Sequence, residues 1–589
     1  MENREELERM LPFLPVLLRS SSLFWPPAAV EAMKALARGP DHSKVDSGEV
    51  LFLAISDIRL SLNLAADRLA SAAAHGYALF FDDLITRADA AKFFGEVVPA
   101  LAKLLLRFPS LLETHYKKVG GVIDYGGRNG VKTFLRLLES QEPGIVFLSQ
   151  FVAVAFRNDN GVSIRIPAGN GEFSRLLHVI RMCLHKLGKQ AIGIKLLLDL
   201  SAFVGMLTWR RQAEELIGAL LACSFFCLFP ITNRGAKHLP QINFDQLFAS
   251  LYEIYNEKQE HKLMCIIHYF ERICSCTPMG YVSFERKVLP LEHNYVGISY
   301  PNASFWRKSV TPLCPFEVYN SGLIEDQTNE ALEVDFANKY IGGGALNRGC
   351  VQEEIRFMIN PELIAGMLFL PSMADNEAIE IVGAERFSNY IGYASSFRFC
   401  GDYVDKRDVD CLGRRKTRII AIDALITPRK RQYGHECLLR FKIRQVALKW
   451  IKSGIRYEDI KEEVHESPSA SEQIMCDLTS SFEENGSWSQ VGIATGNWGC
   501  GAFGGDPELK AIIQWLAASQ ALRPFIFYYT FSVEALQTLY QVTRWISSQR
   551  WTVGELWNIL AEYSTQRLKG KIEVGFFSWL LPVLAARDL

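Results

Sequence analysis

The pattern of hydrophobic residues changes near the middle of the chain. Up to about residue 241, apolar residues recur three or four positions apart, as in the segments Leu51–Leu62, Phe94–Leu105 and Leu196–Leu207. This spacing gathers them on one face of a helix. The first part of the chain is therefore predicted to be mostly helical.

In the rest of the chain, short β-branched and aromatic runs alternate with helical stretches. The runs at 378–382, 418–422 and 525–529 are typical of strands, and those at 438–451 and 509–521 are typical of helices. This alternation predicts an α/β layer structure with a largely parallel or mixed sheet. Ligands of such sheets bind at the loops that follow the carboxyl ends of the strands, so we expect the chemistry there.

The length of the chain indicates how many domains it forms, and its charge indicates which ligands it could attract. A domain usually has about 100–200 residues, so a chain of 589 residues is too long to fold around a single hydrophobic core. We predict a helical domain over 1–241 and an α/β domain over 242–589. The 64 Lys and Arg residues nearly balance the 65 Asp and Glu residues, so no overall field would draw the protein to nucleic acid or an anionic membrane. A polyanionic ligand would have to be held by a local site.

No metal site and no membrane segment are predicted. The 13 cysteines contain no CxxC pair, and the 11 histidines form no HExxH motif or His/Cys cluster. The acidic start Met1–Glu6 is unlike a secretory or transit peptide. The stretch 216–233 carries no charge, but its proline and polar residues favour a buried helix over a membrane span.

A glycine-rich loop follows the strand predicted at 491–495. Five glycines occur within the ten residues Gly496–Gly505, and Asp506 and Pro507 then suit the N-cap and first turn of a helix. Glycines let the backbone approach a ligand and turn several N–H groups toward it, while a helix start adds positive potential. These properties suit a diphosphate.

Two other interpretations of this loop stay open. The segment Gly499–Gly504 also satisfies GxGxxG, which would indicate a nicotinamide-dependent oxidoreductase. That pattern lies late in the chain, however, and Thr530–Ser532 stands where such a fold needs an acidic residue, with Glu534 just beyond. The loop could also be a turn with a structural role alone.

A second motif combines three glycines with two glutamates. Gly342–Gly344 ends an apolar strand, where glycine is costly in conformational entropy unless a group must lie against the backbone. Seven residues later, Gln352–Glu354 begins an amphipathic helix. Neighbouring helix positions point about 100° apart, so one carboxylate would address the oxygen of a scissile bond and the other an adjacent hydroxyl. An apolar cleft and a second carboxylate would raise the pKa of one glutamate and so suit it to act as a general acid. The alternative interpretation is that both glutamates are solvated and have no catalytic role.

Together these motifs resemble the poly(ADP-ribose) glycohydrolase family, in particular its plant members. The family signature is a triple glycine followed at a short distance by Gln-Glu-Glu, and here seven residues separate the two parts. The resemblance covers residues 240–560 in detail. Further matching segments are Asp335–Asn338, Asn360–Leu363, Gly392–Ala394 and Thr495–Gly505.

The resemblance implies a macrodomain-like α/β/α sandwich with a mixed sheet, preceded by a mostly helical accessory domain. It implies hydrolysis of ribose–ribose O-glycosidic bonds in poly(ADP-ribose), mainly from the chain end, releasing ADP-ribose without a metal or other cofactor. Glu354 would be the general acid that protonates the leaving 2′-hydroxyl, through an oxocarbenium-like state. Glu353 would hold ribose hydroxyls, and Asp335 would support the site geometry.

Other residues are implied to bind the ADP-ribose unit. Ile324 and Glu325 would contact adenine, and Gln352, Asn338 and Phe531 would lie at the distal ribose. The remaining implied contacts line the ligand or wrap its diphosphate: Gly342, Gly343, Gly344, Tyr393, Asn497, Trp498, Gly499, Cys500, Gly501, Ala502 and Phe503.

The implied partners are poly(ADP-ribose) and poly(ADP-ribosyl)ated proteins, in the nucleus and cytoplasm and in the response to DNA damage. We expect a monomer without membrane attachment or sequence-specific nucleic-acid binding. A catalytically silent ADP-ribose reader is the alternative function, although a reader would not need both glutamates. Basic clusters at 414–418 and 429–431 could be solvated loops, a track for the polymer or a nuclear import signal.

Overall fold

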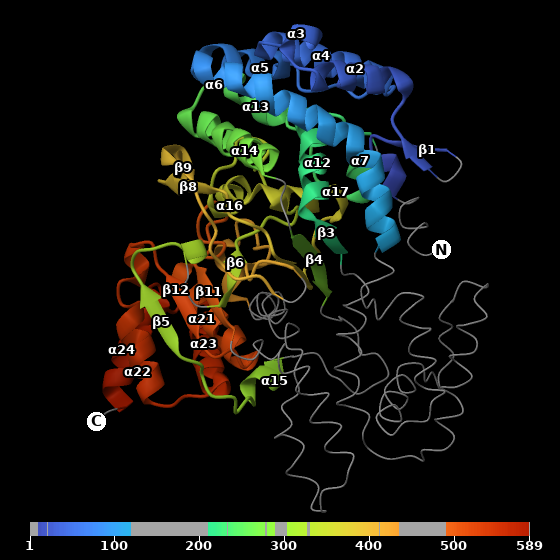
Figure 1. Cartoon of the computed structure of the whole chain (residues 1–589). Coiled ribbons are helices and arrows are strands. Elements are labelled where there is room, and N and C mark those ends of the chain that lie inside the picture. The colour runs from blue at the N-terminus through green and yellow to red at the C-terminus, as the bar shows by residue number, and fades with distance from the viewer. Residues whose placement is uncertain are drawn as a thin grey trace, which may run out of the picture.

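The computed structural model has a helical layer at one end and a mixed sheet flanked by helices at the other (Figure 1). The predicted helical stretches at 196–207 and 438–451 lie outside the residues that the structure describes. The described residues are 10–19, 22–118, 210–232, 234–276, 280–288, 303–326, 330–410, 413–434 and 491–587.

The helical layer is built from helices whose apolar faces meet. Its main helices are α2 (Pro27–Ala37), α4 (Gly48–Ser61), α5 (Ala73–Ala78), α7 (Val98–Lys118), α12 (Glu214–Phe225), α13 (Asp245–Glu253) and α14 (Glu257–Ser275). α2 and α12 pack against α7, while α13 packs against both α5 and α14. The predicted helical character is confirmed for the described part of this region.

An aromatic cluster fills the centre of the helical layer. Tyr77 of α5 stacks on Phe248 of α13 with 3.6 Å between the ring centroids, and Phe81 and Phe225 pack around this pair. Aromatic side chains bury a large apolar area each, so this cluster contributes strongly to joining the helices.

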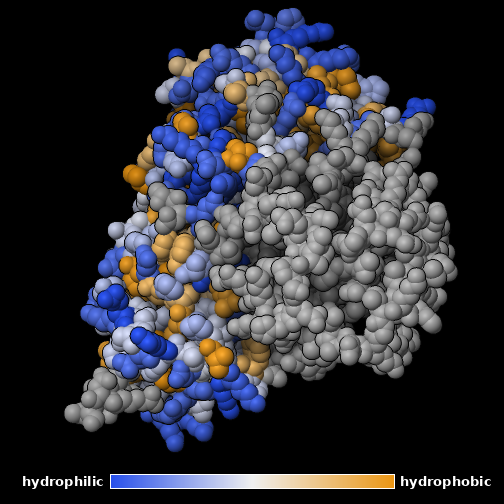
Figure 2. Space-filling model, turned by 60° about the horizontal axis from the view of Figure 1, so that its bottom comes forward, coloured by the Kyte–Doolittle hydropathy of each residue, from blue (hydrophilic) through white to orange (hydrophobic). Residues whose placement is uncertain are grey.

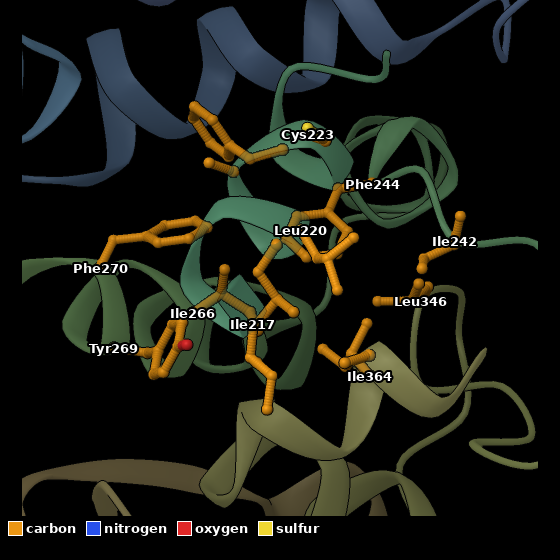
Figure 3. Packing of buried hydrophobic residues seen from close by; sticks show 14 of the residues in the cluster. Ile217, Leu220, Cys223, Ile242, Phe244, Ile266, Tyr269, Phe270, Leu346 and Ile364 are labelled. Atoms are coloured by element: carbon orange, nitrogen blue, oxygen red, sulfur yellow. The ribbon is translucent and has the colours of Figure 1, made fainter. Parts of the chain in front are cut away.

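α12 connects the helical layer to the sheet side of the molecule. Figure 3 shows Ile217 and Leu220 of α12 packed between Phe270 of α14 and Ile364, with Leu346 in the same cluster. The core is therefore continuous from the helices to the segment between the triple glycine and the glutamates. Of the stretch 216–233 predicted as a buried helix, the part up to Phe225 lies in α12 and the rest is not helical where the structure describes it. No helix among the described residues is long and apolar enough to cross a membrane.

The sheet has eight strands in the order β3-β4-β7-β10-β6-β11-β12-β5. The strands are β3 (Arg210–Ala213), β4 (Tyr281–Val288), β5 (Phe316–Tyr319), β6 (Ala331–Asp335), β7 (Glu377–Val382), β10 (Arg418–Ala421), β11 (Gly492–Gly496) and β12 (Ile526–Tyr529). β10, β6, β11, β12 and β5 are parallel to one another, and the pairs β10/β7, β7/β4 and β4/β3 are antiparallel. The predicted mixed sheet and its four predicted strands are confirmed.

Helices cover both faces of this sheet. Successive residues of a strand point to opposite faces, and accordingly Ile419 of β10 joins the core of the helical layer while Ile420 joins a second core. α16 (Gln352–Ile359) and α17 (Gly366–Phe369) lie on the first side. The second side is covered by α21 (Pro507–Gln520), α22 (Leu539–Ser548), α23 (Val553–Leu568) and α24 (Phe576–Arg587). This is the predicted α/β/α sandwich.

The predicted domain boundary after residue 241 falls between α12 and α13. α13 packs on α5, and α14 packs on α13 and α7, so the helical layer continues to Ser275. The boundary itself stays a prediction.

The two basic clusters have different surroundings. Arg414 is buried and pairs with Asp410 at 2.7 Å, and Arg415 pairs with Glu385 at 2.7 Å. Arg414 and Arg415 are therefore paired with carboxylates of the protein itself, whereas Lys416 of the same cluster is partly exposed and pairs with Glu330 at 3.0 Å. The role of this cluster stays a prediction. The second cluster, 429–431, is exposed. On the face shown in Figure 2, hydrophilic residues predominate among the described ones and hydrophobic residues are scattered.

Gly76 permits the close contact between α5 and α13. A Cβ at this position would lie 2.0 Å from the carbonyl oxygen of Phe248, a backbone atom that cannot easily move aside. We expect Gly76→Ala to lower the free energy of unfolding by about 1–3 kcal/mol, as overpacked substitutions do. Gly95→Ala is the control, since nothing lies within 4 Å of its added Cβ. Thermal unfolding of both variants checks this, and equal midpoints would contradict it.

Candidate active site

The predicted site residues gather at the carboxyl ends of the parallel strands. β6 ends at Asp335 and leads into the triple-glycine turn, and β11 ends at Gly496 and leads into the glycine-rich loop. β6 and β11 are neighbours in the sheet, with Glu333 opposite Ala494. The segments that follow them therefore leave the sheet side by side, although about 160 residues separate them in the chain.

Both glutamates are buried and are held by backbone N–H groups of the triple-glycine turn. Glu353 accepts hydrogen bonds from the N–H groups of Gly342 at 2.7 Å and Asn338 at 2.8 Å. Glu354 accepts from the N–H groups of Gly344 and Val351, both at 2.9 Å. The interpretation of a solvated pair is wrong, because the turn encloses the carboxylates and replaces water as their donor.

The glycines are required because the carboxylates themselves lie against the backbone. Gly343 has a left-handed φ of 48°, and a Cβ there would lie 2.6 Å from an oxygen of Glu353 and 2.7 Å from one of Glu354. A Cβ at Gly349 would lie 2.7 Å from the carboxyl carbon of Glu354. Any side chain at either position would displace the glutamates.

Asp335 adds a third buried carboxyl group next to this pair. Neither of its carboxylate oxygens has a hydrogen-bond partner among the described residues. Burial raises the pKa of Asp335 to about 7; Arg356 opposes this rise and Glu354 adds to it. Burial also raises the pKa of Glu353 well above its usual value, with contributions from Asp335 and Glu354, against the N–H groups of Asn338 and Gly342. The cluster therefore retains a proton near neutral pH.

An ion-pair network joins α16 to β6, the two elements that carry the cluster. Arg356 of α16 forms an ion pair with one carboxylate oxygen of Glu333 of β6 at 2.6 Å, and Arg407 forms an ion pair with the other oxygen at 2.7 Å. Arg407 also donates to the backbone carbonyl of Glu325 at 2.7 Å. Sequence reasoning missed this network; its one signal was the acidic Glu333 inside a buried strand, where only a paired charge is tolerated.

Ile324 and Glu325 lie in a short 3-10 turn at the same edge of the sheet, and both are buried. The Glu325 carboxylate accepts a hydrogen bond from the Tyr390 hydroxyl at 2.6 Å. Arg407 thus ties the residues predicted for adenine to the strand that carries the carboxyl cluster.

Gln352 and Asn338 fix the start of the triple-glycine segment. The Gln352 side chain accepts from the N–H of Phe336 at 2.8 Å and donates to the carbonyl of Val334 at 3.2 Å. The Asn338 side chain accepts from the N–H of Tyr340 at 3.0 Å. Both side chains therefore order the backbone around the predicted ligand position.

Two half-exposed aromatic rings lie around the cluster. Tyr393 is 53% exposed, and its hydroxyl interacts with the backbone of Gln352 and with the charge of Glu354. Phe531 is 44% exposed, and its ring lies over Gly496, where an added Cβ would be 3.2 Å away. Phe531 thus offers apolar surface at the end of β11, and Tyr393 offers it beside Gln352 and Glu354.

Two side chains of the glycine-rich loop point into the fold. Trp498 is fully buried and donates from its indole N–H to the carbonyl of Ile422 at 2.8 Å. Asn497 donates to the carbonyl of Thr530 at 2.9 Å and accepts from the Tyr528 hydroxyl at 3.2 Å. These bonds fix the loop to its neighbouring strands, so these two residues would meet a ligand through their backbone.

The middle of this loop presents unused donors. Internal bonds join Gly504 to the carbonyl of Gly501 at 3.0 Å and Gly505 to that of Gly499 at 2.9 Å, and Cys500 donates from its thiol to Trp498 at 3.5 Å. The N–H groups of residues 501–503 have no acceptor among the described residues. Successive free N–H groups form a concavity that suits an anion.

The predicted N-cap of α21, Asp506, is confirmed. Asp506 accepts from the N–H groups of Glu508 at 3.0 Å and Leu509 at 3.2 Å, and Pro507 occupies the first turn. The helix start is thus already capped by its own carboxylate. An anion would be bound by the loop N–H groups rather than by this helix end.

No group of three or more metal-ligating side chains occurs among the described residues. The absence of a metal cofactor stays a prediction, as do the predicted ligand contacts.

The chain matches both parts of one known family. Residues 303–538 match the macro domain fold of poly(ADP-ribose) glycohydrolase, and residues 85–156 and 210–286 match the helical domain of the same family. The first match covers β5 to β12 with α16, α17 and α21 of the sandwich, and the described part of the second covers α7, α12, α13 and α14 of the helical layer together with β3 and most of β4.

Two full-length relatives come from Arabidopsis thaliana. Poly(ADP-ribose) glycohydrolase 1 is 51% identical over 100% of this chain and 99% of the relative, and probable poly(ADP-ribose) glycohydrolase 2 is 46% identical over 99% and 100%. Poly(ADP-ribose) glycohydrolase 1 of Caenorhabditis elegans is 33% identical over 45% of this chain and 30% of the relative. The chain therefore belongs to the poly(ADP-ribose) glycohydrolase family, as a member of the plant type.

Proposed function

We propose that this protein hydrolyses the ribose–ribose O-glycosidic bonds of poly(ADP-ribose), mainly from the chain end, and releases ADP-ribose. The observation that carries the proposal is the pair of buried carboxylates, Glu353 and Glu354, at the sheet edge where three N–H groups of the neighbouring glycine-rich loop have no acceptor in the described part of the chain. An anion-binding loop next to a proton-holding carboxyl cluster suits a substrate that has a diphosphate near its scissile sugar bond. The family membership supports the same activity.

The terminal ADP-ribose unit would span the carboxyl ends of four parallel strands. Its diphosphate would bind the N–H groups of residues 501–503, and its adenine would bind at Ile324 and Glu325. Phe531 and Tyr393 would cover the distal ribose from the exposed side. This orientation would bring the anomeric carbon to the carboxyl cluster.

Glu354 would then act as the general acid. Protonation of the leaving 2′-oxygen by Glu354 breaks the C–O bond and leaves an oxocarbenium-like ribose. Water then adds to this ribose and gives a proton back to the Glu354 carboxylate. The turn N–H groups hold the Glu354 carboxylate in a fixed orientation, which reduces the entropic cost of proton transfer. Asp335 and Glu353, both with raised pKa values, keep a proton in the cluster near neutral pH.

Glu354→Gln tests the assignment of the acid. We expect turnover of automodified polymer to fall by about 10²–10⁴-fold, the usual contribution of a general acid, while ADP-ribose still binds. Chromatography of released ADP-ribose and calorimetry measure the two quantities. Glu534→Gln is the matched control, because Glu534 is exposed and would matter only at a nicotinamide site. Wild-type protein that binds ADP-ribose without cleaving polymer would favour the silent reader instead.

The pH dependence of kcat should follow the carboxyl cluster. Burial and the charges of Asp335 and Glu354 raise the pKa of Glu353, and burial raises the pKa of Asp335 to about 7, so turnover is expected to fall as the pH rises above about 7 and the cluster loses its proton. Asp335→Asn removes one negative neighbour and lowers the pKa of Glu353, so the alkaline decline should begin at lower pH. Initial rates between pH 5 and pH 9 check this, and an unshifted profile would contradict it.

The diphosphate contact can be tested at Gly501, where an added Cβ has nothing within 4 Å. Gly501→Asp should weaken ADP-ribose binding by about tenfold or more through repulsion between like charges, whereas Gly501→Asn has the same size without the charge. Titration calorimetry at two salt concentrations compares the variants. Equal affinities would exclude an anion at this loop.

A further inference from the structure

A lysine of the helical layer lies beneath the turn that carries Glu354. Lys262 of α14 has no exposed surface, and its ammonium donates to the carbonyls of Asn347 and Gly349, both at 2.6 Å, with Gly344 at 3.5 Å. A lysine is seldom fully buried unless its charge is compensated. Here three backbone carbonyls from one turn surround it.

The same turn contacts Glu354 from its other side. The N–H of Gly344 donates to Glu354, and Gly349 lies so close that an added Cβ would be 2.7 Å from the Glu354 carboxyl carbon. The turn is closed by a bond from the N–H of Gly349 to the carbonyl of Gly344 at 3.1 Å. Its carbonyls thus face Lys262 while an N–H group faces Glu354.

A second side chain of α14 binds the same turn without a charge. Gln259 donates to the carbonyl of Asn347 at 3.1 Å and to the Ser250 hydroxyl of α13 at 2.7 Å. One neutral donor therefore already contacts the turn, and Lys262 adds a positive charge with several donors. Hydrogen bonds from a charged donor are stronger than neutral ones, and more so in a buried site.

We propose that Lys262 is a positioning residue for hydrolysis: its ammonium fixes the turn Gly344–Gly349, and through that turn it sets the orientation of the Glu354 carboxyl group. The inference rests on the proposed role of Glu354. It makes the helical layer a component of the catalytic machinery, since α14 reaches the acid through a single buried charge.

The charge of Lys262 is itself sensitive to pH. Burial lowers the pKa of Lys262 to about 8; Cys350, Glu354 and Cys265 oppose this effect, and Lys258 adds to it. Below pH 8 the ammonium is mostly charged, and above pH 8 it becomes a neutral amine with one donor fewer. Any effect of the Lys262 charge on kcat must therefore decrease as the pH rises, whereas an effect of Lys262 packing on kcat would not change with pH.

The test compares Lys262→Met with Lys258→Met, the same substitution one turn earlier on α14. At pH 7, Lys262→Met should lower kcat by about 30-fold with ADP-ribose affinity within about threefold, while Lys258→Met stays near wild type. The ratio of wild-type to Lys262→Met kcat should narrow between pH 7 and pH 9.5. An unchanged kcat, or a ratio independent of pH, would overturn the proposal.

Lys262→Arg provides a second measurement if the Met variant does not fold. Its guanidinium keeps the charge at alkaline pH, so kcat of this variant relative to wild type should rise across pH 8. A constant ratio would reject the role of the charge. If Glu354→Gln is inactive while both Lys262 variants match wild type, the role of Lys262 is refuted and the proposed function stands. If Glu354→Gln is fully active, the proposed function itself is refuted.

Discussion

The central constraint in this protein is the enclosure of two carboxylates by the backbone of a glycine turn. Glu353 and Glu354 receive four backbone hydrogen bonds between 2.7 and 2.9 Å, three of them from Asn338, Gly342 and Gly344. Buried carboxylates are costly unless such donors replace water, and the turn can approach them only where no Cβ intervenes. The position of α16, the conformation of the turn and the proton affinity of the cluster all depend on this contact.

Cations from two parts of the fold hold the segments that carry the cluster. Arg356 and Arg407 form ion pairs with Glu333 of β6, and Lys262 of α14 donates to the turn carbonyls. Removing one partner of a buried pair leaves an uncompensated charge, which costs about 3–5 kcal/mol. These cations therefore make the geometry of the cluster depend on the sheet and on the helices together.

Packing in the continuous core also makes the geometry of the carboxyl cluster depend on the helical layer. Leu346 and Ile364 on the sheet side share one apolar cluster with Ile217 and Leu220 of α12 (Figure 3). Buried side chains in a close-packed core cannot shift independently of one another. The helical layer and the segment that holds the glutamates thus behave as one packed unit, consistent with the buried contacts of α14.

The sequence alone determined the helical first part, the strands with their α/β order, and the two glycine motifs, because hydrophobic period and glycine content are local properties. It also indicated Asp506 as a helix cap. It could not show that the side chains of Trp498 and Gln352 form hydrogen bonds within the fold, that Arg415 pairs with Glu385, or that Lys262 lies against the turn that holds Glu354. Those contacts join residues that are distant in the chain, and only the strand order and the packing of α14 against α16 bring them together.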